Sequence, residues 1–493
     1  MQGKKSQELE QNIKLAYKKA KDNLIGDARD ICEDILSEFP HNKKIKDLVK
    51  KINSGNIAKS SKIQNPSSTE LQYVINLHTE GRPQQALEAT ELLLKEYPDS
   101  PVLFNTHGII SADLSMFDIA TNDYEQALKR DPSFSDAHNN LGIISQKKED
   151  FEGAINHFKK AIQIDPEYAE AYNNLGVSLI DKGEVEAAIE NFNKALQINR
   201  NYFEAYFGLG CAAKKLGDFK NAQNNFEAAL KIEPDHIEAL FQSALTAKEQ
   251  GFFKEATPIF ERVMELDVKN EKGSLLHLAN MGVAERPSQT PRDYLKNYYR
   301  AQSKSWATET SKYFGHYLIK EAIKKTVPRD SKVKVLDLGC GTGSLAKFLL
   351  GYAGYMDGVD LSEHMLKKAD SLNLYDNLYE EDIVSFLANN DTKYDLITAA
   401  ATLIHFGELD AVFKLVQETL SPSGKFVFSV FDAFAEEIEL NQFQLYSHSA
   451  AYVNKLANKL NFISCYNERA LHEYQGEDPV FAQIFVLELI NGG

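Results

Sequence analysis

The chain is poor in cysteine and has no long apolar stretch. Its 493 residues contain four cysteines, at positions 32, 211, 340 and 465, and none of these forms a C-x-x-C pair. This spacing argues against a disulfide scaffold and a local zinc knuckle, so we predict no metal site and a reducing, cytoplasmic location. The sequence also lacks a run of about 18 apolar residues. Its charged N-terminus leads straight into a helical pattern, so we predict neither a membrane span nor a secretion signal.

The formal net charge is −16, and it is unevenly distributed. Residues 1–62 carry 14 Lys and Arg against 9 Asp and Glu, a net charge of +5, which leaves −21 for the rest of the chain. Sequence-independent binding to nucleic acid requires a basic face, so an acidic body argues against it. The charges of the first 62 residues are interleaved, which is typical of a solvated helical face. We predict no nucleic-acid partner.

A pattern with a period of 34 residues extends from about residue 67 to residue 270. Each unit has a small residue in a first helix, an alanine in a second helix, an aromatic residue four positions later and, in most units, a final proline. The best-matching positions are Gly108, Gly142, Gly176, Gly210 and Ala244; Ala86, Ala120, Ala154, Ala188, Ala222 and Ala256; Tyr124, Phe158, Phe192, Phe226 and Phe260; and Pro98, Pro132, Pro166 and Pro234. Small residues let two antiparallel helices approach closely, and proline ends the second helix because it lacks an N–H group. This pattern is typical of tetratricopeptide (TPR) repeats, so we predict an α-solenoid of six units over residues 67–270.

Further segments flank the repeats. Residues 1–42 resemble a diverged repeat hairpin, and residues 43–66 break the register and end in a polar stretch that is typical of a flexible linker. Residues 271–290 are expected to form a capping helix and a turn-rich junction. The remainder, residues 291–493, is predicted to form a second domain.

Asparagine pairs recur in two first helices of the predicted solenoid. Asn139 and Asn140 are followed one period later by Asn173 and Asn174, and Gly208 ends the series. First helices face the concave groove of such an array, which commonly binds a peptide or protein, and amide side chains can bond an extended backbone. We therefore predict a protein or peptide partner on this face. Exposed polar residues that serve only solubility are the alternative.

The second domain contains an apolar run that ends in a glycine-rich turn. Residues 333–338 form the run, and Gly339, Gly341 and Gly343 follow it before a helix begins. A buried parallel strand followed by such a turn lets a cofactor lie close to the backbone. Several classes of nucleotide-binding protein share this pattern. Asp337 makes it more specific, because a carboxylate at the strand end suits the ammonium group of a cofactor.

Acidic residues also follow the next two predicted strands. Asp360 ends the second strand, 23 residues after Asp337, where a carboxylate can accept both ribose hydroxyls. Asp382 and Ile383 follow the third strand, where an acid and an apolar side chain suit an adenine amino group and its ring. Together with the glycine turn, these residues predict a site for a nucleoside-containing cofactor.

These blocks resemble the motifs of class I S-adenosylmethionine-dependent methyltransferases over about residues 290–490. More narrowly, the chain is similar to a bacterial family of predicted methyltransferases with N-terminal TPR repeats, on the features Asp293 to Trp306, residues 358–366, residues 374–376 and residues 445–453. The resemblance implies an α plus α/β chain, in which a Rossmann-like, doubly wound, seven-stranded methyltransferase domain with a C-terminal strand hairpin follows the TPR solenoid. It also implies S-adenosylmethionine as the cofactor. The residues expected to bind it are Asp337, Gly339, Cys340, Gly341, Thr342, Gly343, Asp360, Leu361, Asp382, Ile383 and Ala400.

Methyl transfer is an in-line displacement in which the protein aligns the acceptor and removes its proton where required. The catalytic candidates are His405, after the fourth predicted strand, and Tyr446 with His448, before the last helix. Histidine has a suitable pKa range for a general base, although a histidine in a turn more often makes a surface hydrogen bond. Residues 400–406 lack the Asn/Asp-Pro-Pro-aromatic block that grips planar amino groups, which argues against adenine and glutamine as acceptors.

Three functions are compatible with these features to different degrees. We predict an active methyltransferase whose repeats recruit a substrate or partner. A TPR scaffold with a catalytically silent cofactor domain is the alternative, and the intact glycines and Asp360 argue against it. An NAD-dependent oxidoreductase is disfavoured, because no Tyr-x-x-x-Lys follows the fourth predicted strand.

Overall fold

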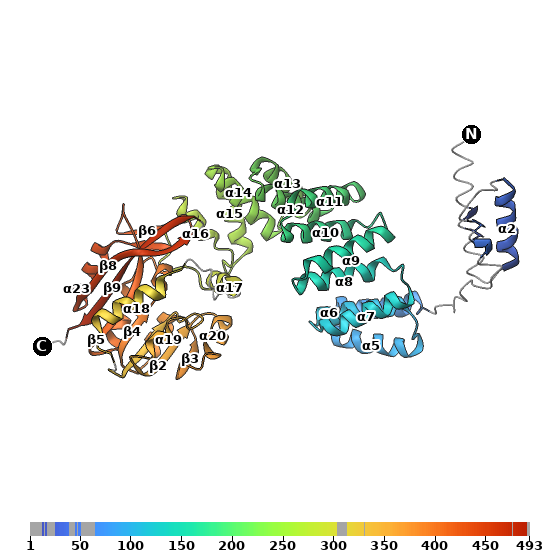
Figure 1. Cartoon of the computed structure of the whole chain (residues 1–493). Coiled ribbons are helices and arrows are strands. Elements are labelled where there is room, and N and C mark those ends of the chain that lie inside the picture. The colour runs from blue at the N-terminus through green and yellow to red at the C-terminus, as the bar shows by residue number, and fades with distance from the viewer. Residues whose placement is uncertain are drawn as a thin grey trace. The chain divides into compact units, whose positions relative to one another are not determined.

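The chain forms two compact units, residues 1–200 and residues 201–493 (Figure 1). The computed structural model describes residues 12–13, 15–16, 25–38, 45–46, 48–50, 65–302, 313–329, 331–475 and 477–490. Most of the predicted linker at 43–66, much of the predicted hairpin at 1–42, and Trp306 lie outside these residues. Within the described part of the chain, no helix combines the length and apolarity needed to cross a bilayer.

Helical hairpins make up the first unit and continue into the second. The first unit contains α2 (Ile25–Glu38), α4 (Ser68–Thr79), α5 (Pro83–Glu96), α6 (Pro101–Asp113), α7 (Phe117–Arg130), α8 (Ser135–Lys147), α9 (Phe151–Ile164), α10 (Ala169–Lys182) and α11 (Val185–Ile198). The second unit begins with α12 (Phe203–Lys215), α13 (Phe219–Ile232), α14 (Ile237–Glu249) and α15 (Phe253–Leu266), followed by α16 (Ser274–Asn280) and α17 (Arg292–Gln302). The helices pair as the 34-residue pattern predicts, which confirms the helical-repeat fold of this region.

The small and aromatic repeat positions meet inside each hairpin. A Cβ atom added to Gly176 would lie 2.7 Å from the ring of Phe192, and one added to Gly142 would lie 2.5 Å from the ring of Phe158. Both rings are fully buried. Glycine at these positions therefore lets the aromatic ring of the second helix pack directly on the backbone of the first, as dense interior packing requires.

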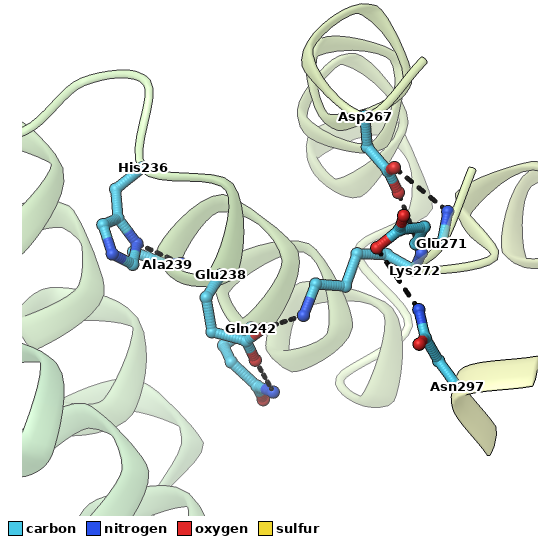
Figure 2. A network of polar contacts seen from close by, with 8 residues as sticks. All are labelled: His236, Glu238, Ala239, Gln242, Asp267, Glu271, Lys272 and Asn297. Carbon is cyan, nitrogen blue, oxygen red and sulfur yellow. Dashed lines mark hydrogen bonds and ion pairs between the residues drawn. The ribbon is translucent and has the colours of Figure 1, made fainter. Parts of the chain in front are cut away.

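A polar network joins the last hairpin to the helices that follow it (Figure 2). The Lys272 ammonium bonds the Glu238 carboxylate of α14. Asp267 accepts the backbone N–H groups of Glu271 and Lys272 at 3.0 and 2.8 Å. Glu271 in turn accepts from the Asn297 amide of α17 at 3.3 Å. The turn between α15 and α16 is thus linked by side chains to α17.

The sheet domain is a doubly wound parallel sheet that ends in an antiparallel hairpin. Its main strands are β3 (Asn377–Glu380), β2 (Ala353–Asp360), β1 (Val333–Leu338), β4 (Tyr394–Ala399), β5 (Leu420–Asp432), β9 (Asp478–Leu489) and β8 (Phe462–Gln475), in that spatial order. The first five are parallel, and β9 runs antiparallel to β5. These seven strands confirm the predicted architecture. Two three-residue strands, β6 (Ile438–Leu440) and β7 (Tyr446–His448), extend the sheet at the end of β5, giving nine strands in all.

Helices cover both faces of this sheet. On one face, α18 (Gly315–Thr326) and α19 (Ala346–Leu349) pack on residues such as Val335 and Val427. On the other, α21 (Ile383–Asn389), α22 (Asp410–Thr419) and α23 (Ala450–Lys459) pack on Leu336 and Phe428. Because successive strand residues point to opposite faces, a nearly continuous apolar run such as β1 supplies both cores.

Candidate active site

A pocket of about 1190 Å³, including open solvent at its mouth, lies at the carboxyl ends of β1, β2 and β4. Doubly wound sheets bind ligands at this edge, because the loops after parallel strands converge there. All of the residues predicted to bind the cofactor line this pocket except Gly343. Residues far apart in the sequence also reach it: Leu295 from α17 and Glu473 from β8 contribute to its lining.

Asp337 is held rigidly at the end of β1. The Thr398 hydroxyl donates to its Oδ1 at 2.7 Å, and the Tyr375 hydroxyl donates to its Oδ2 at 2.9 Å. The side chain is only 2% exposed. Burial raises the pKa of this carboxyl to about 6, the two hydroxyl donors oppose the rise, and the neighbouring Asp360 charge adds to it. Near neutral pH the pocket therefore presents a desolvated carboxylate that a cationic ligand would stabilise.

The glycine turn brings the backbone against the pocket. Gly339, Gly341 and Gly343 all have positive φ angles, of 66°, 54° and 77°. A Cβ atom on Gly339 would also lie 2.3 Å from the hydroxyl oxygen of Thr402. Cys340 lines the pocket within this turn, and burial raises the pKa of its thiol well above the ordinary value. A reactive thiolate at this position is therefore disfavoured.

Asp360 joins the glycine turn to the end of β2. Its Oδ2 accepts the backbone N–H of Gly341, and its Oδ1 accepts that of Ser362, both at 2.9 Å. Burial raises the pKa of Asp360, and these backbone donors oppose the rise. A carboxylate has about four lone-pair sites, so the two bonds leave capacity for hydroxyl groups of a ligand. Leu361 lines the pocket beside it.

The loops after β3 and β4 supply a further part of the pocket lining. Asp382 caps α21 by accepting the N–H groups of Val384 and Ser385 at 3.0 and 3.2 Å, and it lines the pocket together with Ile383. After β4, Ala400 lines the pocket next to Ala401, whose φ of 55° is unusual for a residue with a side chain. Such backbone strain is concentrated at functional sites.

His405 is the one predicted catalytic residue that reaches the pocket. Its Nε2 lies 2.5 Å from the hydroxyl oxygen of Tyr299, and its Nδ1 is buried without a hydrogen-bond partner among the described residues. Burial lowers the pKa of His405 to about 4, and burial raises the pKa of Tyr299 well above 10. Both groups are therefore neutral near pH 7, joined by one hydrogen bond.

Tyr446 and His448 do not line the pocket. Both are fully buried. The Tyr446 hydroxyl donates to the carbonyl oxygen of Pro287 at 2.6 Å, and Nε2 of His448 donates to the carbonyl oxygen of Gly407 at 3.0 Å. Burial lowers the pKa of His448 to about 4. Their side chains thus make structural bonds, and the structure does not bring them together with the predicted cofactor residues.

The predicted junction also supports the loop that carries His405. The Thr290 N–H donates to the His405 carbonyl at 2.8 Å, and the Ser288 carbonyl accepts the N–H of Gly407 at 2.8 Å. Gln289 and Phe406 form an antiparallel bridge between these bonds. Residues 288–290 therefore pair with the wall of the pocket instead of forming a free tether.

The sequence patterns missed several residues that line the same pocket. Tyr298 and Tyr299 of α17, Tyr313, and Glu473 of β8 all line the pocket. The clustering of tyrosines before the first strand was a visible signal, but nothing in the sequence assigned them a ligand. Glu473 lies in a strand more than a hundred residues after the glycine turn, and no local pattern marks it.

The asparagine pairs of the repeats bond one another. The Asn140 amide donates to Asn105 at 2.9 Å, and the Asn174 amide donates to Asn139 at 3.0 Å. Asn139 and Asn173 are only 1% and 6% exposed. The expectation that all four line an open groove is therefore corrected, because Asn139 and Asn173 are buried, and Asn139 bonds Glu170 and Asn174 of the next repeat. Asn140 and Asn174 are partly exposed.

Sequence comparisons assign both parts of the chain. A family described as "Methyltransferase domain" matches residues 311–475, a family described as "TPR repeat" matches residues 146–180 and 178–217, and one described as "Tetratricopeptide repeat" matches residues 203–236.

Among solved structures, that of MamA is 29% identical, covering 34% of this chain and 96% of that one, with a TM-score of 0.31. PilF of Pseudomonas aeruginosa is 19% identical, covering 41% of this chain and 91% of that one, with a TM-score of 0.38.

Curated relatives match a part of the chain. The ubiquinone biosynthesis O-methyltransferase of Paraburkholderia phytofirmans is 33% identical over 99 residues, which are 19% of this chain and 43% of that protein. The protein of the same description from Thiobacillus denitrificans is 32% identical over 108 residues, 21% of this chain and 46% of that protein. The chain thus spans about half the length of these relatives. Taken with the fold and the pocket, the comparisons identify the chain as a tetratricopeptide-repeat protein that carries a C-terminal methyltransferase domain.

Proposed function

We propose that the protein transfers a methyl group from S-adenosylmethionine to an acceptor bound in the same pocket. The observation that carries this proposal is the convergence of Asp337, Asp360 and the glycine turn at one sheet edge. The chemistry of the groups fits the cofactor: a desolvated carboxylate suits an ammonium group, and a second carboxylate suits a ribose diol. A Cβ atom on Gly341 would meet nothing within 4 Å, so the backbone surface there is clear for a ligand.

Different residues of the pocket would bind different groups of the cofactor. Asp337 would hold the ammonium group, Asp360 the ribose hydroxyls, and Asp382 with Ile383 the adenine. When bound, the cofactor supplies an electrophilic methyl group on a sulfonium. The protein then has to align an acceptor, exclude water and remove a proton where the acceptor carries one.

His405 is the group we propose for proton removal. Its pKa of about 4 keeps the imidazole neutral at physiological pH and makes it a weak base, which suits it to accept a proton during the transfer and not to hold one beforehand. The Tyr299 hydroxyl, 2.5 Å from Nε2, can pass a proton to it from an acceptor in the pocket. Tyr446 and His448 are not retained in this role, because their hydrogen bonds face the protein interior.

The TPR repeats support a second element of the proposal, the recruitment of a protein or peptide. Repeat arrays present extended surfaces that bind other proteins. Because the junction residues 288–290 pair with the wall of the catalytic pocket, the last repeats are structurally continuous with it. A scaffold with a silent domain remains the alternative, and it predicts no cofactor binding.

Calorimetric titration of the full-length protein with S-adenosylmethionine tests the proposal, with NAD as the control ligand. We expect binding of the former alone. Asp360→Ala should abolish it without changing the helical circular-dichroism signal of the repeats, because a contact to the ribose is removed. Asp391→Ala, which alters an exposed loop residue, is the matched control and should bind normally. Unchanged affinity in Asp360→Ala would contradict the assignment of the ribose contact.

A further inference from the structure

Part of the pocket lining is built from tyrosine rings. Tyr298 and Tyr299 are adjacent on α17, yet their rings stand nearly perpendicular, at 84°, with centroids 5.2 Å apart. Tyr313 lines the same pocket. Burial, followed by the charge of Glu473, raises the pKa of Tyr298 and of Tyr313, so their phenols stay protonated. These three rings and Glu473, which we call the tyrosine cage, are not used by the cofactor assignment.

Hydrogen bonds from neighbouring side chains hold the Glu473 carboxylate in position. The Gln475 amide donates to its Oε1 at 2.9 Å, and Nδ1 of His472 lies 3.2 Å from its Oε2. His472 is fully buried, and its Nε2 lies 3.3 Å from the Ser429 hydroxyl oxygen. That same oxygen accepts the N–H of Ala401 in the pocket floor at 3.1 Å. The carboxylate is thus part of a buried polar network and holds a defined position at the pocket.

The charge of the lining has one sign. Five carboxylates line the pocket, those of Asp337, Asp360, Glu381, Asp382 and Glu473, and no Lys or Arg is among the described lining residues. Such a surface repels anionic acceptors and attracts cations. The charge of Glu473 acts on all three rings of the tyrosine cage, whereas that of Asp360 acts on Tyr299 and that of Asp337 on Tyr313.

Faces of aromatic rings attract cations, and cages of several rings with a carboxylate are suited to ammonium groups. Building on the methyltransferase function proposed above, we propose that the tyrosine cage is the acceptor subsite and that it binds an aliphatic ammonium group, so that the methylated atom is an amine nitrogen. A lysine side chain of a recruited protein and a free amine both present this ammonium group, and the experiment below distinguishes them. The relatives' printed descriptions name O-methyltransferases, in which the methylated atom is oxygen, and the chain spans only about half the length of those proteins. Methylation of nitrogen goes beyond those descriptions.

The reaction balances with the residues in place. The ammonium loses one proton to solvent at the open mouth of the pocket, which leaves a neutral amine, and the Tyr299 hydroxyl stays bonded to a neutral His405. The amine lone pair then forms the N–C bond as the C–S bond breaks, and the sulfonium becomes a neutral thioether. The product is a methylated ammonium. Glu473 faces a positive charge before and after the transfer.

Saturation-transfer NMR on the full-length protein, saturated with S-adenosylhomocysteine, tests the proposal with three probes of equal chain length: n-butylammonium, n-butanol and butyrate. We expect saturation of butylammonium only. Glu473→Gln should weaken butylammonium binding roughly tenfold, because it removes the paired charge. Glu477→Gln makes the same chemical change at an exposed position of the β8–β9 hairpin and should have no effect.

A second pair of variants keeps the proposal testable if Glu473→Gln does not fold. Tyr298→Leu, at a ring that is 37% exposed, should weaken butylammonium binding about two- to fivefold, whereas Tyr298→Phe keeps the ring face and should retain it. Competition by an acetylated, amidated lysine peptide distinguishes the sources: tighter binding of the peptide indicates a protein acceptor, and tighter binding of butylammonium a free amine.

The failures can be told apart. If S-adenosylhomocysteine does not bind, the proposed function fails. If it binds but butanol or butyrate is saturated as strongly as butylammonium, or butylammonium is not saturated at all, the acceptor proposal alone is overturned. If Glu473→Gln weakens S-adenosylmethionine relative to S-adenosylhomocysteine and leaves butylammonium unchanged, the cage serves the sulfonium of the cofactor, and the proposal is also overturned.

Discussion

Asp337→Asn should stabilise the methyltransferase domain while it destroys cofactor affinity. Burial raises the pKa of Asp337 from 3.8 to about 6 in the folded protein. A folded-state pKa above the unfolded one means that ionisation opposes folding, and a difference of about 2 units corresponds to about 3 kcal/mol at pH 7.5. Asparagine has no charge to desolvate. It offers one acceptor oxygen to the two hydroxyls of Thr398 and Tyr375, so about 1 kcal/mol of hydrogen bonding is lost. The expected net gain is about 2 kcal/mol.

The sign of the effect also sets its pH dependence. The cost of the buried charge is fully present above pH 6, declines as the pH falls toward 3.8, and is absent below that value. The advantage of Asp337→Asn should therefore vanish at acid pH. Conversely, wild-type affinity for S-adenosylmethionine should fall about tenfold between pH 7.5 and pH 5, because only about a tenth of the carboxyl is ionised one unit below its pKa.

Differential scanning calorimetry of the full chain measures the stability of the methyltransferase domain. The unfolding transition of this domain is identified as the one that S-adenosylhomocysteine shifts. Titration calorimetry measures affinity across the same pH range. A variant that is less stable than wild type at pH 7.5, or whose advantage does not change with pH, would refute a desolvated charge at Asp337. Undiminished cofactor affinity would refute its contact with the ammonium group.

Other predictions concern the repeats, the junction and the boundary between them. Gly176→Ala would place a methyl group 2.7 Å from the Phe192 ring, so urea unfolding should show the repeats destabilised by about 1–3 kcal/mol; unchanged stability would contradict the close packing. Tyr446→Phe removes the bond to the Pro287 carbonyl and should cost about 1 kcal/mol in thermal unfolding without changing cofactor affinity, whereas a loss of turnover larger than the loss of stability would return Tyr446 to the catalytic candidates. Deletion of residues 1–270 keeps residues 288–290, which pair with the loop of His405, and should leave a domain that binds S-adenosylmethionine. Aggregation of this fragment would show that the last repeats share a core with the methyltransferase domain.

Local patterns predicted the elements that depend on neighbouring residues. The spacing of Gly142 and Phe158 reflects contact within one hairpin, and the run before Gly339 reflects a strand buried on both faces. Such contacts span few residues, so they recur in the sequence with a readable period. The asparagine pairs show the limit, because the same spacing suits a groove-facing ladder and the bonds that Asn174 and Asn139 make between repeats.

The sequence by itself determined the helical repeats, the doubly wound sheet and the group of residues around the glycine turn that line the pocket, because each rests on short motifs whose residues fold against one another. Only the tertiary structure decided the rest of the lining. Glu473, Tyr298 and His405 lie on β8, on α17 and in the loop after β4, and the fold brings these separate elements to one pocket. The structure likewise showed that His448 bonds the Gly407 carbonyl in the interior. Burial and pairing depend on contacts between residues distant in the chain, and no local spacing encodes them.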